Sequence, residues 1–160
     1  MANKKQEIEH YEKQLISARK IGDRREEGNV LSNLGNAYYS LGEVSKAIKF
    51  HKKALAIDRE IGDRSGEGAA LGNLGLAYAA LGEFRKAIEF HEKALAIDRE
   101  IGDRGGEGAA LGNLGNTLYR LGEKEKGIDL TRQALVIFET IESPHAKLVR
   151  KKLKEWGVRD

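Results

Sequence analysis

A repeat of 40 residues limits the possible folds of this chain more than any other feature of the sequence. The sequence Ile-Gly-Asp-Arg at residues 21–24 recurs twice, each time 40 residues later. Residues 53–75 match residues 93–115 at every position but one, where Ser65 is replaced by Gly105. Near identity of this kind indicates recent duplication or consensus design. A unit this short cannot bury its own apolar surface, so the copies are expected to stack and share a core.

Each repeat carries two helical patterns. In the first, Leu31, Leu34 and Tyr38 recur at steps of three and four residues, which places them on one helical face. Glycine follows each pattern, at Gly42 and Gly62, where a positive φ ends the helix. The inward positions of the second pattern are Ala47, Ile48, His51, Ala54, Leu55, Ile57 or Asp58, and Ile61. The sequence therefore predicts an all-α solenoid of about eight helices.

Glycine and histidine occupy unusual positions in this pattern. Gly35, Gly75 and Gly115 lie in the middle of predicted helices, where glycine costs about 1 kcal/mol relative to alanine. We expect neighbouring helices to approach closely there, because a side chain would clash. His51 and His91 hold equivalent inward positions of the second helices. Metal binding would need further converging ligands, so both are interpreted as buried histidines and not as metal ligands.

The segments that flank the repeats are expected to cover the stack. Residues 4–20 align with the second helix of a repeat. Near the other end, Ser143 is a good helix cap and Pro144 a good first helical residue. We expect a single domain over residues 1–160, with a flanking helix at 4–22, repeats at 23–62, 63–102 and 103–142, and a capping helix at 143–157.

The composition argues against several classes of function. The chain has no Cys, which leaves no disulfide and no thiolate metal site. A net charge of +3, from 28 basic and 25 acidic residues, is too small and too scattered to indicate nucleic acid. No stretch approaches the roughly 20 apolar residues of a membrane span. No nucleophile–base pair or phosphate-binding loop is recognisable. We therefore expect a cytoplasmic protein that is not an enzyme and that uses no cofactor and no metal.

The repeat resembles the tetratricopeptide repeat (TPR), whose pattern is W-x2-L-G-x2-Y, then A-x3-F, then P. Arg59 and Arg99 stand in place of the usual Pro, so the second helix continues to Gly62 and the period exceeds the standard one. The repeat is most similar to those of the Pins/LGN-type adaptors and of bacterial and archaeal TPR signalling arms. The resemblance implies a right-handed α-solenoid of antiparallel helix pairs, the TPR superhelix, that acts as a protein–protein interaction scaffold. In the first copy the matching residues are Leu31, Leu34, Gly35, Tyr38, Ala47 and His51.

In the TPR fold the first helix of each pair lines a concave groove. Asn33, Asn73 and Asn113 recur once per repeat and would form a ladder of amides along it. Each amide offers a donor and an acceptor to a peptide backbone. In family members such a ladder holds an extended peptide, and the resemblance implies the same here. The expected peptide-binding residues are Asn33, Asn36, Tyr39, Ser40, Asn73, Leu76, Ala80, Asn113, Asn116 and Arg120. The expected partner is a protein or peptide segment, extended or helical. The alternative is that these asparagines are solvated surface residues copied by duplication.

Two features near the groove are interpreted in more than one way. Tyr39 or Tyr119 would give a ligand an apolar contact. The arginines at the repeat junctions pair either with acidic side chains of a ligand, as is expected for Arg120, or with acidic residues of their own turn. The junction arginines are Arg24, Arg64 and Arg104.

The ends of the solenoid suggest a second class of function. Ile8 and Ile16 are expected to leave apolar surface uncovered, which favours a weak homo-oligomer formed through the solenoid ends. A self-assembling or designed repeat scaffold with no dedicated ligand is therefore the alternative to a peptide-binding adaptor.

Overall fold

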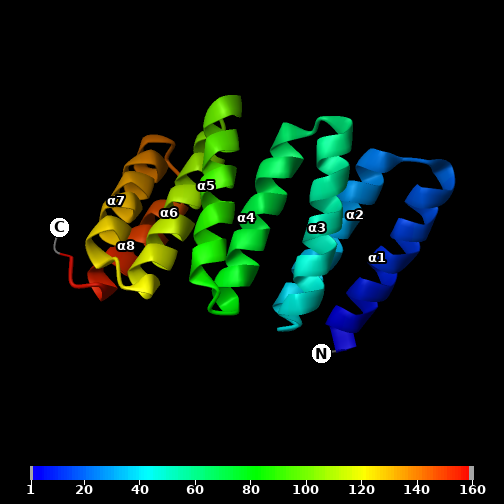
Figure 1. Cartoon of the computed structure of the whole chain (residues 1–160), viewed down its shortest axis with the longest axis horizontal. Helices are drawn as coiled ribbons and strands as arrows, with labels where there is room; N and C mark the ends of the chain where they lie inside the picture. The colour runs from blue at the N-terminus through cyan, green and yellow to red at the C-terminus, as the bar shows by residue number, and fades with distance from the viewer. Residues whose placement is uncertain (1, 159–160) are drawn as a thin grey trace.

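The structure is a computed structural model that describes residues 2–158. Eight α-helices follow one another along these residues, and no strand interrupts them (Figure 1). This arrangement confirms the expected all-α fold and the expected number of helices. The helices are α1 (Ala2–Ile21), α2 (Arg24–Ser40), α3 (Val44–Ile61), α4 (Arg64–Ala80), α5 (Phe84–Ile101), α6 (Arg104–Leu121), α7 (Lys124–Thr140) and α8 (His145–Glu155).

Each helix packs mainly against the helix before it and the helix after it. The helices therefore form an elongated array in chain order, with α1 at one end and α7 and α8 at the other (Figure 1). Contacts also join α2 to α4 and α4 to α6, which are the first helices of consecutive pairs. The fold is an α-solenoid of antiparallel helix pairs, in which the first helices lie along a common face.

Local sequence signals explain where the helices begin and end. The side chains of Asp23, Asp63 and Asp103 each accept a hydrogen bond from the backbone amide three residues later, at 2.9, 2.9 and 2.8 Å. These bonds satisfy amides that have no partner inside the helix. Gly42 and Gly62 adopt φ values of 77° and 70°, and the chain leaves the helix there. Glycine adopts this conformation without the penalty that a Cβ would bring.

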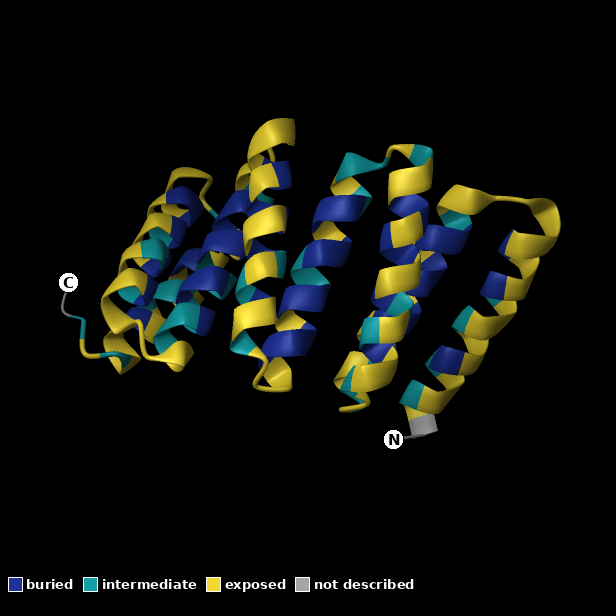
Figure 2. Ribbon diagram, in the orientation of Figure 1, coloured by how far each residue is buried: buried dark blue, intermediate teal, exposed yellow. Residues whose placement is uncertain are grey.

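The core runs through the spaces between the helices. Burial is confined to the helical faces that meet neighbouring helices, while the outer faces are exposed (Figure 2). Helix α3 links the core from end to end, because Ala54 and Ile57 pack with residues of α1 and α2 while Leu55 packs with later helices. Leucines are among the most deeply buried residues, and Leu34 and Leu74 have no exposed surface. Stacking of repeats therefore supplies the burial that one helical pair lacks.

The mid-helix glycines lie where paired helices approach closely, as the sequence predicts. A Cβ on Gly35 would lie 2.5 Å from Cε1 of His51, and one on Gly75 would lie 2.5 Å from Nδ1 of His91. Both imidazoles are buried, with no more than 1% of either residue exposed. Burial lowers the pKa of His51 and of His91 to about 4, so both are neutral at pH 7.

The two ends of the solenoid differ from the expectation in one detail. Ile8 is 8% exposed, so the expectation that it lies uncovered is wrong. It shares the inward face of α1 with Leu15, and both pack against α2 and α3 residues in the core. Ile16, the next residue, turns away from this core and is 68% exposed. At the other end, Ser143 Oγ accepts the backbone N–H of His145 at 3.3 Å, where α8 begins.

Candidate functional site

Two pockets lie on the face formed by the first helices of the pairs. The first has a volume of about 320 Å³ and lies between α4 and α6, with Ala94 and Asp98 of α5 beneath it. The second, of about 310 Å³, lies between α6 and α8, with Thr131 and Phe138 of α7 beneath it. Small residues of the first helices, Gly72 among them, line the walls and leave their backbone accessible. A ligand on this face could therefore approach the backbone closely.

The asparagines predicted to form a ladder lie at or next to these pockets. Asn73 and Asn113 line opposite walls of the first pocket, and Asn113 and Asn116 also line the second. Asn33 holds the equivalent position on α2 and is exposed, outside both pockets. Within residues 2–158, no side-chain amide of Asn33, Asn73 or Asn113 takes part in a hydrogen bond with the chain. Each amide therefore keeps both a donor and an acceptor for a ligand.

The structure separates the remaining predicted residues into two groups. Leu76 lines the first pocket and is 37% exposed, so it offers apolar surface beside Asn73. The others lie outside both pockets. Ser40 donates a hydrogen bond from Oγ to the carbonyl oxygen of Asn36, at 2.9 Å. The exposed residues outside the pockets are Asn36, Tyr39, Ser40 and Ala80.

Two side chains near the end of α6 are already engaged by the chain. The guanidinium carbon of Arg120 lies 4.7 Å from the centre of the Phe84 ring, and Nη1 lies 3.5 Å from the carbonyl oxygen of Ala79. The ring of Tyr119 stacks on Trp156, with 4.0 Å between the ring centres. Arg120 therefore packs α6 against α5, and Tyr119 packs α6 against the end of α8. Neither side chain lines the two pockets.

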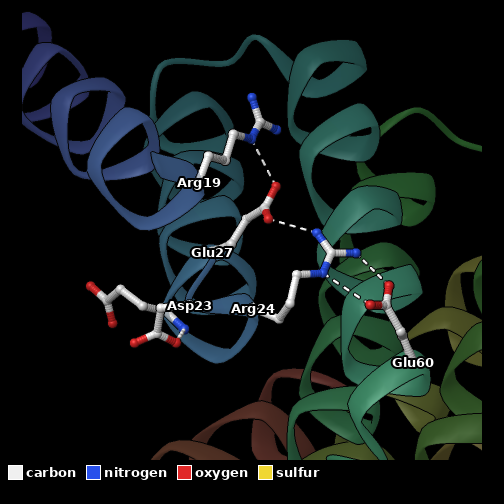
Figure 3. Close-up of polar contacts among 6 residues, drawn as sticks. Arg19, Asp23, Arg24, Glu27 and Glu60 are labelled. Carbon is white, nitrogen blue, oxygen red and sulfur yellow. Dashed lines mark hydrogen bonds and ion pairs between the residues drawn. The ribbon is translucent and has the colours of Figure 1, made fainter. Parts of the chain in front are cut away.

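The junction arginines pair with acidic residues of the chain. Glu27 accepts a hydrogen bond from Arg19 at 2.8 Å and another from Arg24 at 2.6 Å (Figure 3). Nε of Arg24 also donates to Oε1 of Glu60 on α3, at 3.0 Å. Burial raises the pKa of Glu27, but the hydrogen bonds from the two arginines outweigh it, so the pKa lies below its usual value. The cluster therefore joins α1 to α2 through Glu27, and α2 to α3 through Arg24 and Glu60.

The whole arrangement recurs in the next repeat, and the glutamate with its two arginines recurs in the third. Glu67 accepts hydrogen bonds from Arg59 at 2.7 Å and from Arg64 at 2.5 Å, and Arg64 continues to Glu100. Glu107 accepts from Arg99 at 2.8 Å and pairs with Arg104. Of the two interpretations of the junction arginines, pairing within the chain is correct. Each junction arginine donates to Glu27 or to its equivalent in the same turn.

Two buried carboxylates have no role in the predictions made from the sequence. Asp58 on α3 and Asp98 on α5 are each 8% exposed. Burial, reinforced by neighbouring carboxylates, raises the pKa of each to about 6. Asp98 lies beneath the first pocket, whereas the sequence marks it only as an acidic residue on an otherwise inward helical face. An acidic residue at an apolar position is the signal that could have revealed it.

The chain belongs to the tetratricopeptide repeat family, whose sequence profile matches residues 8–60 and 66–140. This match confirms the family that the repeat pattern indicates. The fold of this family generally mediates protein–protein interactions, and its members are typically scaffolds without catalytic activity. No curated protein matches the sequence.

Solved structures of other proteins share the fold. BtubC (BKLC) from P. vanneervenii superposes with a TM-score of 0.79 and 23% sequence identity, over 94% of this chain and 64% of that one. The TPR domain of Arabidopsis FLU superposes with a TM-score of 0.70 and 26% sequence identity, over 73% of this chain and 98% of the domain. A Rap protein complexed with Competence and Sporulation Factor superposes with a TM-score of 0.80 and 20% sequence identity, over 89% of this chain and 40% of Rap. The chain spans less than two thirds of BtubC and of Rap.

Residues 2–158 lack two further features. No three His, Asp or Glu side chains gather there in a way that could hold a metal ion. None of the helices in that range has the length and apolarity that crossing a membrane requires.

Proposed function

We propose that this chain is an interaction scaffold that binds a peptide segment of a partner protein along the face formed by α2, α4 and α6. One observation carries the proposal. Asn73 and Asn113 line the same pocket, and neither side-chain amide is used by the chain. A peptide backbone presents alternating donors and acceptors, which such amides match.

The surroundings of the ladder suit a backbone ligand. Ala69 and Ala109 are exposed on the two walls of the first pocket, and Gly72 lies between Ala69 and the ladder residue Asn73. Small side chains let a ligand's main chain come within hydrogen-bonding distance of the asparagine amides. Leu76 adds apolar surface on the same wall. Three repeats bury a limited area, so we expect affinities in the micromolar range.

The similar structures support the use of this fold for protein partners. The Rap structure contains a bound factor, which its description names as Competence and Sporulation Factor. That complex is a property of Rap. At 20% sequence identity, the likeness between Rap and this chain extends to the fold alone. It supports the proposal only in showing that a related solenoid is found in complex with another molecule.

A peptide selection tests the proposal directly. Random 12-residue peptides displayed on phage would be selected on the full chain, and the affinities of the recovered peptides measured by fluorescence anisotropy. In the test variant Asn33, Asn73 and Asn113 are all replaced by Ala. We expect this variant to bind the selected peptides at least tenfold more weakly, because each lost amide removes a pair of hydrogen bonds.

A second triple variant supplies the control. Lys49, Glu89 and Asp129 occupy one equivalent exposed position on α3, α5 and α7, away from the ladder helices. Their replacement by Ala should leave affinity within twofold of the parent chain. If the asparagine variant retains full affinity, or if both variants lose affinity equally, the ladder does not bind the peptide.

Association through the solenoid ends remains a prediction. Ile16 of α1 and Leu148 of α8 are 68% and 65% exposed, which leaves apolar surface near both ends of the array. Sedimentation velocity over a hundredfold range of concentration would test it. A constant sedimentation coefficient would show that these surfaces do not associate. The division into one domain of three repeats with flanking helices, and the cytoplasmic location, likewise remain predictions.

A further inference from the structure

The pocket between α4 and α6 contains a buried carboxylate that nothing in the chain neutralises. Asp98 lies beneath this pocket and is 8% exposed. Among residues 2–158, no donor hydrogen-bonds to its carboxylate and no cation pairs with it. Space for the carboxylate comes from glycine, since a Cβ on Gly106 would lie 2.8 Å from Cγ of Asp98 and one on Gly68 would lie 3.1 Å from Oδ1. A largely buried carboxylate without a counter-charge favours binding of a cation from outside the chain.

A second carboxylate faces the same space. Asp103 also lines the pocket, and its Oδ2 would lie 2.7 Å from the same Cβ position on Gly106. Oδ1 of Asp103 accepts the amide of Gly106, which leaves Oδ2 available. The nearby Glu107 is occupied by Arg99 and Arg104. Burial first, and then the charges of Asp103 and Glu107, raise the pKa of Asp98 to about 6, and no cation opposes them.

The equivalent site between α2 and α4 shows what fills such a space. There the carboxylates are Asp58 and Asp63, and Arg25 of α2 reaches them from the chain itself. Nη1 of Arg25 lies 2.6 Å from Oδ2 of Asp63, and its charge lowers the pKa of Asp58, against the larger effect of burial. One repeat later, the position of Arg25 is taken by Ser65, which lines the pocket and carries no charge. Asp63 is therefore partly covered, whereas Asp103 is exposed.

The third equivalent site, between α6 and α8, has a different character. Phe138 and Ser143 stand in place of the two carboxylates, and Gly105 stands in place of Arg25. Phe138 contacts the ring of His145 there, with 5.5 Å between ring centres. The three inter-repeat sites are thus one acidic site with its own arginine, one acidic site that is open, and one apolar site.

We infer that the Asp98–Asp103 pocket binds the guanidinium group of an arginine side chain supplied by the partner peptide. This inference rests on the proposed function, which it deepens by naming a residue that the ligand must contain. A guanidinium is planar and presents parallel N–H donors, so it can serve two carboxylates at once. Asn73 and Asn113 line the same pocket, so they lie where the main chain on either side of that arginine would run.

The inference is tested with a probe that contains the arginine alone. N-acetyl-arginine N-methylamide would be titrated into the ¹⁵N-labelled full chain, and amide shifts followed by NMR. We expect saturable shifts at Gly106 and Asn73. The citrulline analogue has nearly the same shape without the charge, and should bind at least tenfold more weakly. Asp98→Asn should weaken arginine binding by a similar factor.

Two exchanges between repeats make the sharpest variants. Ser65→Arg copies Arg25 into the second site and should abolish binding of the probe, because the chain then fills its own pocket. Arg25→Ser opens the first site, and should add a second set of shifts at Gly66. Helical content measured by circular dichroism confirms that each variant is folded. Equal shifts with the arginine and citrulline probes, or unchanged binding by Ser65→Arg, would overturn the inference.

The peptides selected on the groove separate this inference from the proposed function. If they contain arginine, and Ser65→Arg weakens their binding at least tenfold, both proposals are supported. If they lack arginine and bind Ser65→Arg as they bind the parent chain, yet lose affinity when the three asparagines are replaced, the arginine pocket is wrong and the ladder is right. If the arginine probe binds while the asparagine variant keeps full peptide affinity, the pocket is right and the ladder is wrong.

Discussion

The imidazole of His51 packs directly on the backbone of Gly35, so closely that a Cβ on this glycine would lie 2.5 Å from Cε1 of the ring. The same contact recurs one repeat later between Gly75 and His91. Each pair joins the two helices of one hairpin, and both histidines are buried. Glycine lowers the stability of the first helix of each pair, but it makes room for a buried imidazole from the second helix.

Gly75→Ala should destabilise the chain by about 1–3 kcal/mol, because the added methyl group forces the His91 ring and α5 to move. Gly72→Ala is the matched control, since a Cβ at Gly72 meets nothing within 4 Å in the same helix. This control should stabilise the chain by about 0.5–1 kcal/mol through the better helix propensity of alanine. Urea unfolding followed by circular dichroism measures both changes. Equal effects of the two substitutions would contradict the close approach.

The acid response of stability should depend on two opposing pairs of buried groups. His51 and His91 have pKa values near 4 in the folded chain, below the ordinary 6.5, so the unfolded chain takes up their protons first as the pH falls. Their contribution to stability is therefore lost between pH 6.5 and about 4. Asp58 and Asp98 have pKa values near 6, above the ordinary 3.8, so the folded chain takes up these protons first. Between pH 6 and 4 they oppose the histidines.

A double substitution of Asp58→Asn and Asp98→Asn should expose the histidine effect. We expect the free energy of unfolding of this variant to fall by roughly 2–3 kcal/mol per histidine between pH 7 and pH 4.5. The parent chain should lose far less over the same range. Urea unfolding at a series of pH values measures the difference. Identical pH dependence of the two chains would show that the carboxylates do not oppose the histidines.

Glu67→Gln should destabilise the chain by about 1–2 kcal/mol. The Glu67 side chain is 10% exposed and accepts hydrogen bonds from both Arg59 and Arg64. Replacing its buried carboxylate by a neutral amide weakens two charge-assisted hydrogen bonds. Glu123→Gln is the control, because Glu123 pairs with Lys126 at the surface, where the ion pair contributes little. Thermal unfolding compares the two, and a loss no larger for Glu67→Gln than for Glu123→Gln would remove the junction cluster as a source of stability.

Trp156→Ala should loosen α8 without affecting the middle of the array. Trp156 stacks on Tyr119 at 4.0 Å, with 3° between the ring planes, and this contact ties the end of α8 to α6. Hydrogen exchange by mass spectrometry should show faster exchange in residues 145–155 and unchanged exchange in α4. Uniform acceleration along the chain would instead mean that α8 and the repeats unfold together.

Much of the candidate binding surface could be predicted residue by residue, but not its chemistry. The spacing of Asn73 and Asn113 places both on one helical face, and the structure brings them to one pocket. Arg120 was expected on the same face, yet its guanidinium lies on Phe84 of the neighbouring hairpin. Helical periodicity locates a Cα position well, but it does not say where a long side chain ends.

The period, the family, the helix ends at Gly42 and Gly62, and the close helical contact at Gly35 could be predicted from the sequence, because each follows from residue preferences repeated at a fixed spacing. The packing of the helices was needed to learn that Arg24 reaches Glu60, and that Asp98 has no counter-charge while Arg25 supplies one at the equivalent site. Those outcomes depend on which side chains from different helices meet across the stack. Ser65 and Arg25 are equivalent in register, but they differ in length and charge, and that difference leaves one site closed and the other open.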